Sequence, residues 1–387
     1  MRSIVLGLAF ATAVPVADLH GRSDRSPSSL PRWNELDAAL AELNASETYP
    51  TVDEILPLGA MLDRLVHDFP DVHRWPNATA ESFVIASCRV SEALGEAGSP
   101  THDRLRVVTR GRAVAAASGI SADRLLEYGR SAIALSTHAG EIALNEGRLD
   151  EGHRAFARSI RDMNRCNDLL LLPRVRVGLA ETRRLQGRFA DAETQLDHLE
   201  EWLDGVASEN PEPGRPTFVQ WFASAETLLR GARIVLYADM GLPDQAARWL
   251  AKKPDAGDAT APDDEYAEID LRAVVALAGE RCQRVVGLID DELLARTPVH
   301  WRGILRTRRG VALAELALRD PSLVDAARRD LEDASIDAPS FGLRKLSEIT
   351  LLDLAVVRAD WDDVRARLAA LRRDADAPAP HVDEQAL

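Results

Sequence analysis

The sequence has few aromatic residues, few cysteines and very little lysine. Aromatic residues make up 5% of the 387 residues, and the three cysteines are far apart, with none in a CxxC pair. This spacing argues against a disulfide framework and against a zinc site. A core with so few aromatic rings must be built mainly from alanine, leucine and valine, which favours helices over sheets. Lysine occurs only at Lys252, Lys253 and Lys345; we interpret this arginine bias as that of a bacterial coding sequence.

Motifs that would indicate catalysis are also missing. The chain contains no GxSxG, HExxH, GxxxxGK[ST] or dinucleotide-binding glycine fingerprint. Two histidines and two aspartates lie between residues 67 and 73, but Pro70 interrupts them, so they form no helical metal-binding pair. Residues 167–168 resemble half of a magnesium–diphosphate motif, but Leu171 and Val175 occupy the other ligand positions. We therefore predict that the protein is not an enzyme and holds no metal or cofactor.

The charge of the chain limits the partners it can bind. With 47 basic and 62 acidic residues the formal net charge is −15, which makes nucleic acid an unfavourable partner but leaves room for a local basic surface. The apolar run Ile4–Ala17 is shorter than the roughly 20 residues that a membrane-spanning helix needs. We predict no stable membrane span and a cytoplasmic location. The alternative is export, with this run as a signal peptide.

The hydrophobic pattern predicts an all-α protein. Amphipathic stretches with apolar residues three and four positions apart recur along the chain, whereas alternating strand patterns are almost absent. We divide the chain into an apolar segment and linker (1–31), a helical region (32–132), helical repeats (133–373) and a disordered tail (374–387).

One short pattern recurs in the repeat region. In its first copy a small residue, Gly147, is followed five positions later by Gly152 and four positions after that by Phe156. Further copies begin at residues 187, 241, 279, 320 and 359, so the intervals are 40, 54, 38, 41 and 39 residues. The long interval contains the Pro-rich insertion 209–216, and without it the period is close to 40.

This pattern predicts pairs of helices joined by tight turns. The first small residue ends one helix, because the turn needs a positive φ or a close backbone approach. The second small residue lies where the two helices cross, and the large residue fills the groove between them. A single pair cannot bury both of its faces, so successive pairs must stack into a superhelix.

The pattern resembles the G-x-[FY]-x-x-A-x-x-x-[FYL] core of tetratricopeptide repeats. Gly140 fits the packing glycine of the family's first helix, and Tyr237 fits its aromatic position. The family period is about 34 residues, so the period here is closer to a longer variant found in bacterial signalling proteins. The resemblance implies a right-handed α-solenoid that binds proteins or peptides in a regulatory role, without catalysis.

The resemblance also implies which side chains face a partner on the concave surface. The first helix of each pair would line this surface, and its side chains include mixed arginine, glutamate and asparagine, which suit charge-assisted hydrogen bonds to a peptide. A generic solvated surface would carry the same residue types. The predicted contacts are Thr137, Glu141, Asn145, Arg174, Glu181, Arg184 and Tyr266.

A second interpretation is a ligand-sensing transcriptional regulator. Residues 110–130 resemble a helix-turn-helix with Gly119 at the turn, and Ser121 and Arg124 would then contact DNA. Asp123 at the phosphate-facing start of the second helix and the acidic balance of the chain argue against this interpretation.

Overall fold

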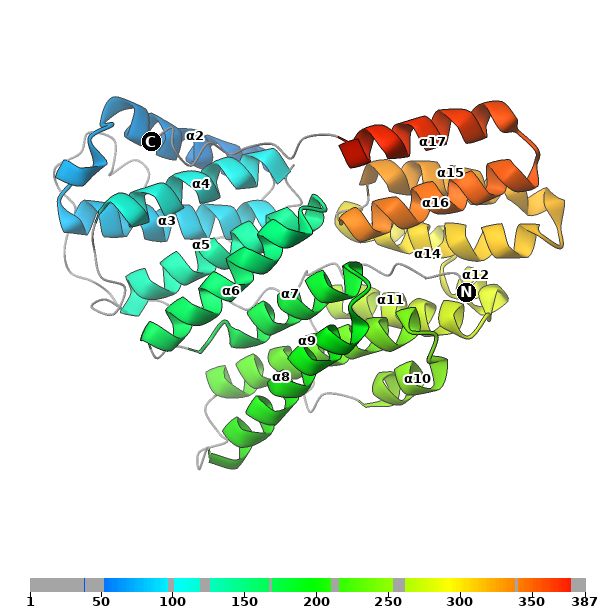
Figure 1. The fold of residues 1–387 in the computed structure, drawn as a ribbon, viewed down its shortest axis with the longest axis horizontal. Coiled ribbons are helices and arrows are strands. Elements are labelled where there is room, and N and C mark those ends of the chain that lie inside the picture. The colour runs from blue at the N-terminus through cyan, green and yellow to red at the C-terminus, as the bar shows by residue number, and fades with distance from the viewer. Residues whose placement is uncertain are drawn as a thin grey trace. The chain divides into compact units, whose positions relative to one another are not determined.

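The computed structural model describes residues 52–96, 101–118, 126–166, 169–209, 216–252, 262–337 and 340–376, together with Ala38. Within these residues the chain is all-helical and contains no strand, as the sequence predicts (Figure 1). The same residues contain no helix with enough length and hydropathy to cross a membrane.

The described helices follow one another with short connections. The first are α2 (Val52–Asp68), α3 (Asn77–Glu96), α4 (Thr101–Ala117), α5 (Leu126–Asn145), α6 (Leu149–Cys166), α7 (Leu172–Leu185) and α8 (Phe189–Glu209). They are followed by α9 (Pro216–Asp239), α10 (Pro243–Ala251), α11 (Pro262–Ala278), α12 (Cys282–Leu288), α13 (Asp291–Arg296), α14 (Val299–Ala317), α15 (Val324–Asp337), α16 (Phe341–Val357) and α17 (Trp361–Asp376). Two short 3-10 helices are η1 (Val72–Arg74) and η2 (Pro321–Leu323).

Local sequence explains where several helices begin. The Asp290 side chain accepts a hydrogen bond from the backbone N–H of Leu293 at 2.7 Å and caps α13. Ser340 caps α16 in the same way. Pro243 stands in the first turn of α10, where its missing N–H leaves no hydrogen bond unmade.

The chain divides into two compact units, residues 52–182 and 183–376 of the described part. In the first unit α2 packs on α3 and α4, α3 and α4 pack on α5, and α5 packs on α6. In the second unit each helix packs on its sequence neighbour in α8–α12 and α14–α17, and α9 packs on α11, α11 on α14, and α14 on α16. A pattern in which helices contact both the next helix and the next but one is compatible with a helical solenoid.

The predicted turns are the most regular feature of the fold. Gly147, Gly187 and Gly241 all have positive φ, between 69° and 80°. After each of them the next N–H bonds to the carbonyl five residues back; Arg148 N, for example, donates to Ala143 O at 2.8 Å. This is the Schellman arrangement that ends a helix with a left-handed residue. Ala359 at the last predicted turn has φ 55° and the same bonding.

Two of the six predicted turns need correction. At the fourth turn the left-handed residue is Glu280, with φ 57°, rather than Gly279, whose N–H still bonds to Val275 O in the last turn of α11. At the fifth turn Asp320 has φ −130° and its carboxylate accepts from the N–H of Ser322, so a 3-10 helix replaces the left-handed turn. We refer to α5–α6, α7–α8, α9–α10, α11–α12, α14–α15 and α16–α17 as turn-linked pairs.

The small residues predicted at the helix crossings are buried. These residues are Gly152, Ala192, Ala246 and Ala327. A Cβ on Gly152 would lie 3.2 Å from the carbonyl oxygen of Gly140, so a larger side chain would push α5 and α6 apart. A Cβ on Gly140 would lie 2.8 Å from the Phe156 ring, which confirms Gly140 as a packing glycine.

The large residues that follow them are buried in three copies. Phe156, Leu196 and Leu331 are at most 1% exposed. In the last copy the prediction is wrong, because Leu368 on α17 is 39% exposed. No later helix of the described chain packs on that side of α17.

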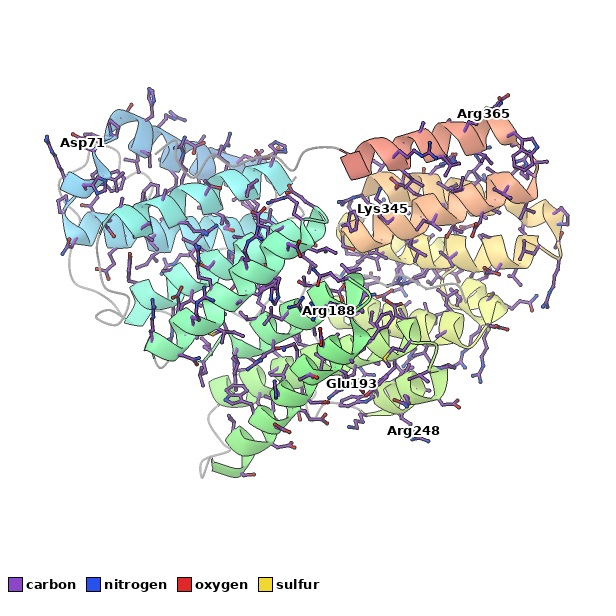
Figure 2. The ribbon with its side chains drawn as sticks, viewed as in Figure 1. Asp71, Arg188, Glu193, Arg248, Lys345 and Arg365 are labelled. Carbon is purple, nitrogen blue, oxygen red and sulfur yellow. The ribbon has the colours of Figure 1, made fainter. Side chains whose placement is uncertain are left out.

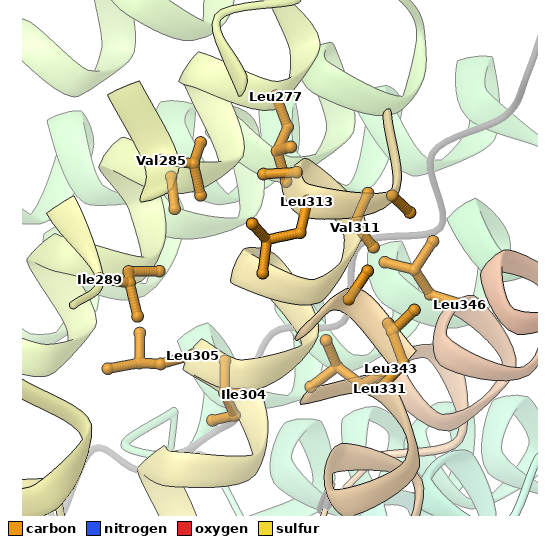
Figure 3. Packing of buried hydrophobic residues seen from close by; sticks show 14 of the residues in the cluster. Leu277, Val285, Ile289, Ile304, Leu305, Val311, Leu313, Leu331, Leu343 and Leu346 are labelled. Carbon is orange, nitrogen blue, oxygen red and sulfur yellow. The ribbon is translucent and has the colours of Figure 1, made fainter. Parts of the chain in front are cut away.

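The core of the second unit is an aliphatic layer between turn-linked pairs. Leu277, Val285, Ile304, Leu331 and Leu343 come from five different helices and pack in one cluster (Figure 3). The first unit has a cluster of the same kind, which includes Phe83 and Tyr128. The low aromatic content therefore reflects a core built from thin layers between helices.

Candidate functional site

The seven positions predicted to contact a partner lie mostly inside the helical packing. Thr137, Glu141, Glu181, Arg184 and Tyr266 are buried, and Asn145 and Arg174 are half-buried. A buried side chain meets a docked partner only if the helices rearrange. The role of these residues as partner contacts stays a prediction, and the bonds described below show what five of them do in this structure.

Glu141 on α5 is the centre of a buried ion-pair cluster. Arg104 on α4 donates from Nη2 to Glu141 Oε2 at 2.8 Å, and Arg174 on α7 donates from Nη2 to the same oxygen at 3.0 Å. The Nε of Arg174 also donates to Glu141 Oε1. Burial by itself would raise the pKa of Glu141, but the charges of Arg174 and Arg104 outweigh it and hold this pKa well below its usual value. One carboxylate thus joins three helices.

A second carboxylate completes this arrangement, which we call the Glu141 cluster (Glu92, Arg104, Glu141 and Arg174). Glu92 on α3 lies with its Oε1 3.7 Å from Arg174 Nη1. Burial raises the pKa of Glu92, Arg174 opposes this rise, and the charge of Glu141 adds to it. Two guanidinium and two carboxylate groups balance in formal charge, which makes their burial tolerable.

Two further titratable groups lie beside the cluster. His138 Nδ1 lies 3.0 Å from the Ser91 hydroxyl, and Arg104 Nε donates to the backbone carbonyl of Ser91 at 3.1 Å. Burial, followed by the charges of Arg104 and Arg174, lowers the pKa of His138 well below its usual value. Burial and the charge of Glu92 raise the pKa of the Cys88 thiol to about 12. Cys88 is therefore protonated at neutral pH and is a poor nucleophile.

Similar pairs tie helices together in the second unit. In each, an arginine on one helix binds a carboxylate on the first helix of a neighbouring turn-linked pair. These pairs are Arg184–Asp239, Arg230–Glu268 and Arg308–Asp270. Both side chains of the first and third pairs are less than a tenth exposed. Charge-assisted hydrogen bonds of this kind fix the register of one helix against the next.

Thr137 and Tyr266 also connect helices. The Thr137 hydroxyl on α5 donates to the Ser159 hydroxyl on α6 at 3.2 Å. The Tyr266 hydroxyl on α11 donates to the carbonyl of Arg296 at 3.3 Å, and its ring lies 6.5 Å from that of Trp301. Both side chains contribute to packing between helices.

The other kinds of site considered from the sequence are a DNA contact and a metal site. Ser121 and Arg124, the predicted DNA contacts, lie outside the described residues. Within those residues no group of three or more histidine, cysteine, aspartate or glutamate side chains could hold a metal ion. A cavity between α15, α16 and α17, lined by Val324, Leu351 and Arg358 among others, measures about 10 Å³, which is room for one water molecule.

The last turn-linked pair exposes large apolar side chains. Ile349 and Val356 are seven residues apart on one side of α16, and Trp361 and Leu368 are seven residues apart on one side of α17. Val357 lies next to the turn between them, and Trp361 is 56% exposed. We call these five residues the α16–α17 apolar surface. Large apolar side chains exposed to water on adjacent helices are a feature of protein interaction sites.

Comparison with known proteins identified no relative of this chain. No family model matches the chain, and no curated protein or solved structure matches it. The resemblance to tetratricopeptide repeats therefore depends on the turn pattern and on the packing of the helices.

Sequence reasoning missed most residues of the buried ion pairs, including Arg104, Glu92 and Asp239. One signal was available. Arg174 follows Glu141 by 33 residues and Arg308 follows Asp270 by 38, so opposite charges recur at about one repeat length. Without knowledge of which helix faces turn inward, that spacing does not distinguish a buried pair from two surface charges.

Proposed function

We propose that this protein is a non-catalytic protein-binding scaffold, built as a right-handed α-solenoid of tetratricopeptide-like pairs. The α16–α17 apolar surface carries the proposal. An exposed tryptophan is unfavourable in water, and its burial by a partner is favourable.

The regular turns support this function. Left-handed residues at positions 147, 187, 241, 280 and 359 end the first helix of five pairs, at intervals of 40, 54, 39 and 79 residues, and the last interval spans two pairs because a 3-10 helix forms the turn after Asp320. Repeats of this kind present an extended outer surface, and such surfaces serve docking. The buried ion pairs hold the helices of the earlier pairs in register.

Charges around the apolar surface indicate the chemistry of the partner. Arg358, Arg365 and Arg372 are exposed on the same pair of helices, and Arg365 projects from α17 (Figure 2). Arg365 binds Asp362, but both side chains remain largely open to water. The expected partner is a protein segment that combines apolar side chains with flanking carboxylates.

Site-specific photo-crosslinking tests this proposal. A photoreactive phenylalanine analogue replaces Trp361 in the full chain, expressed in the cells that make the protein, and the adducts are identified by mass spectrometry. The matched control carries the same analogue at Thr194, which is exposed on α8. We expect a defined protein adduct at position 361 and none at position 194.

A binding measurement with the identified partner completes the test. Trp361→Ala should weaken binding at least about tenfold, which is about 1.4 kcal/mol, and Thr194→Ala should leave it unchanged. Identical adducts at both positions, or an adduct of two copies of this chain alone, would contradict the proposal of a separate partner.

A further inference from the structure

One exposed face of α6 carries only arginine among its charged residues over three turns. Arg154, Arg158, Arg161 and Arg165 are exposed and follow one another at intervals of four, three and four residues. Residues at these intervals lie in a row along a helix. We call them the α6 arginine stripe. It extends over about 16 Å at a rise of about 1.5 Å per residue.

The packing of α6 fixes the direction of this stripe. Gly152, Phe156, Ser159 and Met163 are buried and show the same intervals of four, three and four. They precede the arginines by two residues each, which is about 200° around a helix. The buried row faces the neighbouring helices, as the contact of Phe156 with Gly140 shows. The α6 arginine stripe therefore points away from the packed side.

The charge of the stripe is largely unneutralised. Among the described residues Arg154, Arg158 and Arg161 have no carboxylate within ion-pairing distance, and Arg165 has only Asp162, at 3.7 Å. Elsewhere an exposed arginine does pair with a carboxylate one turn away, as Arg272 does with Glu268 at 3.1 Å. Like charges one turn apart destabilise a helix. The arrangement thus opposes the stability of α6, in a chain that has acidic residues in excess.

We infer that the α6 arginine stripe is a docking site for a carboxylate-rich helical segment of a partner protein. Guanidinium groups bind carboxylates through paired hydrogen bonds, and each new pair would remove a repulsion within the stripe. A partner helix with glutamates at intervals of four, three and four matches the row. This inference does not depend on the α16–α17 apolar surface, because the two lie on different helices and are tested separately.

A protein partner fits the stripe better than a nucleic acid or a membrane. Asp150 is exposed one turn before Arg154, and Glu151 lies beside it, so the basic row ends after about 16 Å and does not continue along a longer phosphodiester backbone. A duplex carries one negative charge per about 1.7 Å, so the net charge of −15 repels it more strongly than a short helical segment with four carboxylates. Membrane-surface helices insert an apolar face, whereas Phe156 and Met163 on the apolar face of α6 are already buried.

Fluorescence anisotropy with synthetic helical peptides tests the inference. The probe is an alanine-based peptide with glutamates at intervals of four, three and four, and the control peptide carries glutamine at those positions. We expect the full chain to bind the glutamate peptide, to bind it less tightly as salt is raised, and not to bind the glutamine peptide.

Two variants with equal changes of charge separate the stripe from the net charge of the chain. The stripe variant is Arg154→Glu, Arg158→Glu and Arg161→Glu; the control variant is Arg248→Glu, Arg281→Glu and Arg284→Glu, at positions that are also exposed. The stripe variant should lose at least about tenfold in affinity and should bind a lysine version of the peptide instead. The control variant should bind the glutamate peptide as the natural chain does.

Circular dichroism confirms that both variants are folded before binding is compared. Equal affinity of the two variants for the glutamate peptide would overturn the inference. So would equal binding of the glutamine peptide by the natural chain, or tighter stripe-dependent binding of duplex DNA or phosphatidylserine vesicles. None of these outcomes bears on crosslinking at Trp361, so the two proposals fail independently.

Discussion

Arg308 on α14 binds Asp270 on α11 through two parallel hydrogen bonds inside the protein. Its Nε donates to Oδ1 at 2.6 Å and its Nη2 donates to Oδ2 at 3.3 Å, with both side chains almost completely buried. The pair connects two turn-linked pairs in the second unit, as the Glu141 cluster connects helices in the first. Buried arginine–carboxylate pairs are thus a recurring device of this fold.

Breaking the Arg308–Asp270 pair should destabilise the protein strongly. Asp270→Ala leaves a guanidinium group buried without its carboxylate, and we expect a loss of about 3–5 kcal/mol in the free energy of unfolding. Arg308→Met should have a similar effect, and the double variant should lose clearly less than the two single losses together. Urea unfolding measures all three. Arg272→Ala removes an exposed ion pair on the same helix and should cost below about 1 kcal/mol; additive effects in the double variant would contradict this account.

The pH dependence of stability should reveal the buried imidazole of His138. Its folded pKa is well below the ordinary 6.5, so below that pH the unfolded chain takes up a proton that the folded chain refuses. The contribution of His138 to the free energy of unfolding is therefore fully present above pH 6.5 and is lost as the pH falls below that value. Relative to His138→Gln, the natural chain should lose about 1 kcal/mol between about pH 7 and 5.5.

Denaturant unfolding at several pH values checks this prediction. The comparison with His138→Gln removes the opposite contribution of Glu92, whose raised pKa makes the folded state gain stability as the pH falls. His198→Gln, at an exposed position on α8, is the matched control and should leave the pH dependence as it is. The same pH dependence in His138→Gln and the natural chain would show that His138 is not buried in its neutral form.

At a left-handed turn, introducing a glycine and replacing a glycine should change the stability of the protein in opposite directions. Glu280 adopts φ 57°, so Glu280→Gly should stabilise the protein by about 0.5–1 kcal/mol. Gly187 has φ 73°, and a Cβ there would meet nothing within 4 Å, so Gly187→Ala should destabilise by about 1 kcal/mol through its backbone conformation alone. Thermal unfolding of both variants measures these changes.

Gly205 provides the control for this pair of substitutions. It lies inside α8 with equally open space around its Cβ position and without a positive φ. Gly205→Ala should therefore stabilise the helix by about 1 kcal/mol, because alanine is the better helix former. If Gly187→Ala and Gly205→Ala shifted the melting temperature in the same direction, the left-handed conformation assigned to Gly187 would be contradicted.

The sequence was sufficient for local features of the fold. Helix periodicity predicted an all-α chain, and small residues at fixed intervals predicted the turns at Gly147, Gly187 and Gly241, because a left-handed turn depends on a few adjacent residues. The displaced turn at Glu280 shows the limit of this reasoning. There the left-handed residue comes one position after the glycine, and Gly279 N–H still bonds to Val275 O, so the preference of a single residue does not set the exact position of the turn.

What the amino-acid sequence alone determined, then, is the helical class, the period near 40 and the positions of most turns. Only the tertiary structure decided which charges are buried. Glu141 and Arg184 look like surface residues along their own helices, and both are buried because arginines or carboxylates from distant helices meet them. The same packing decided that the arginines of α6 stay in water, since Phe156 in the opposite row is already held between helices. Burial depends on contacts between segments far apart in the chain, and no single stretch of sequence contains that information.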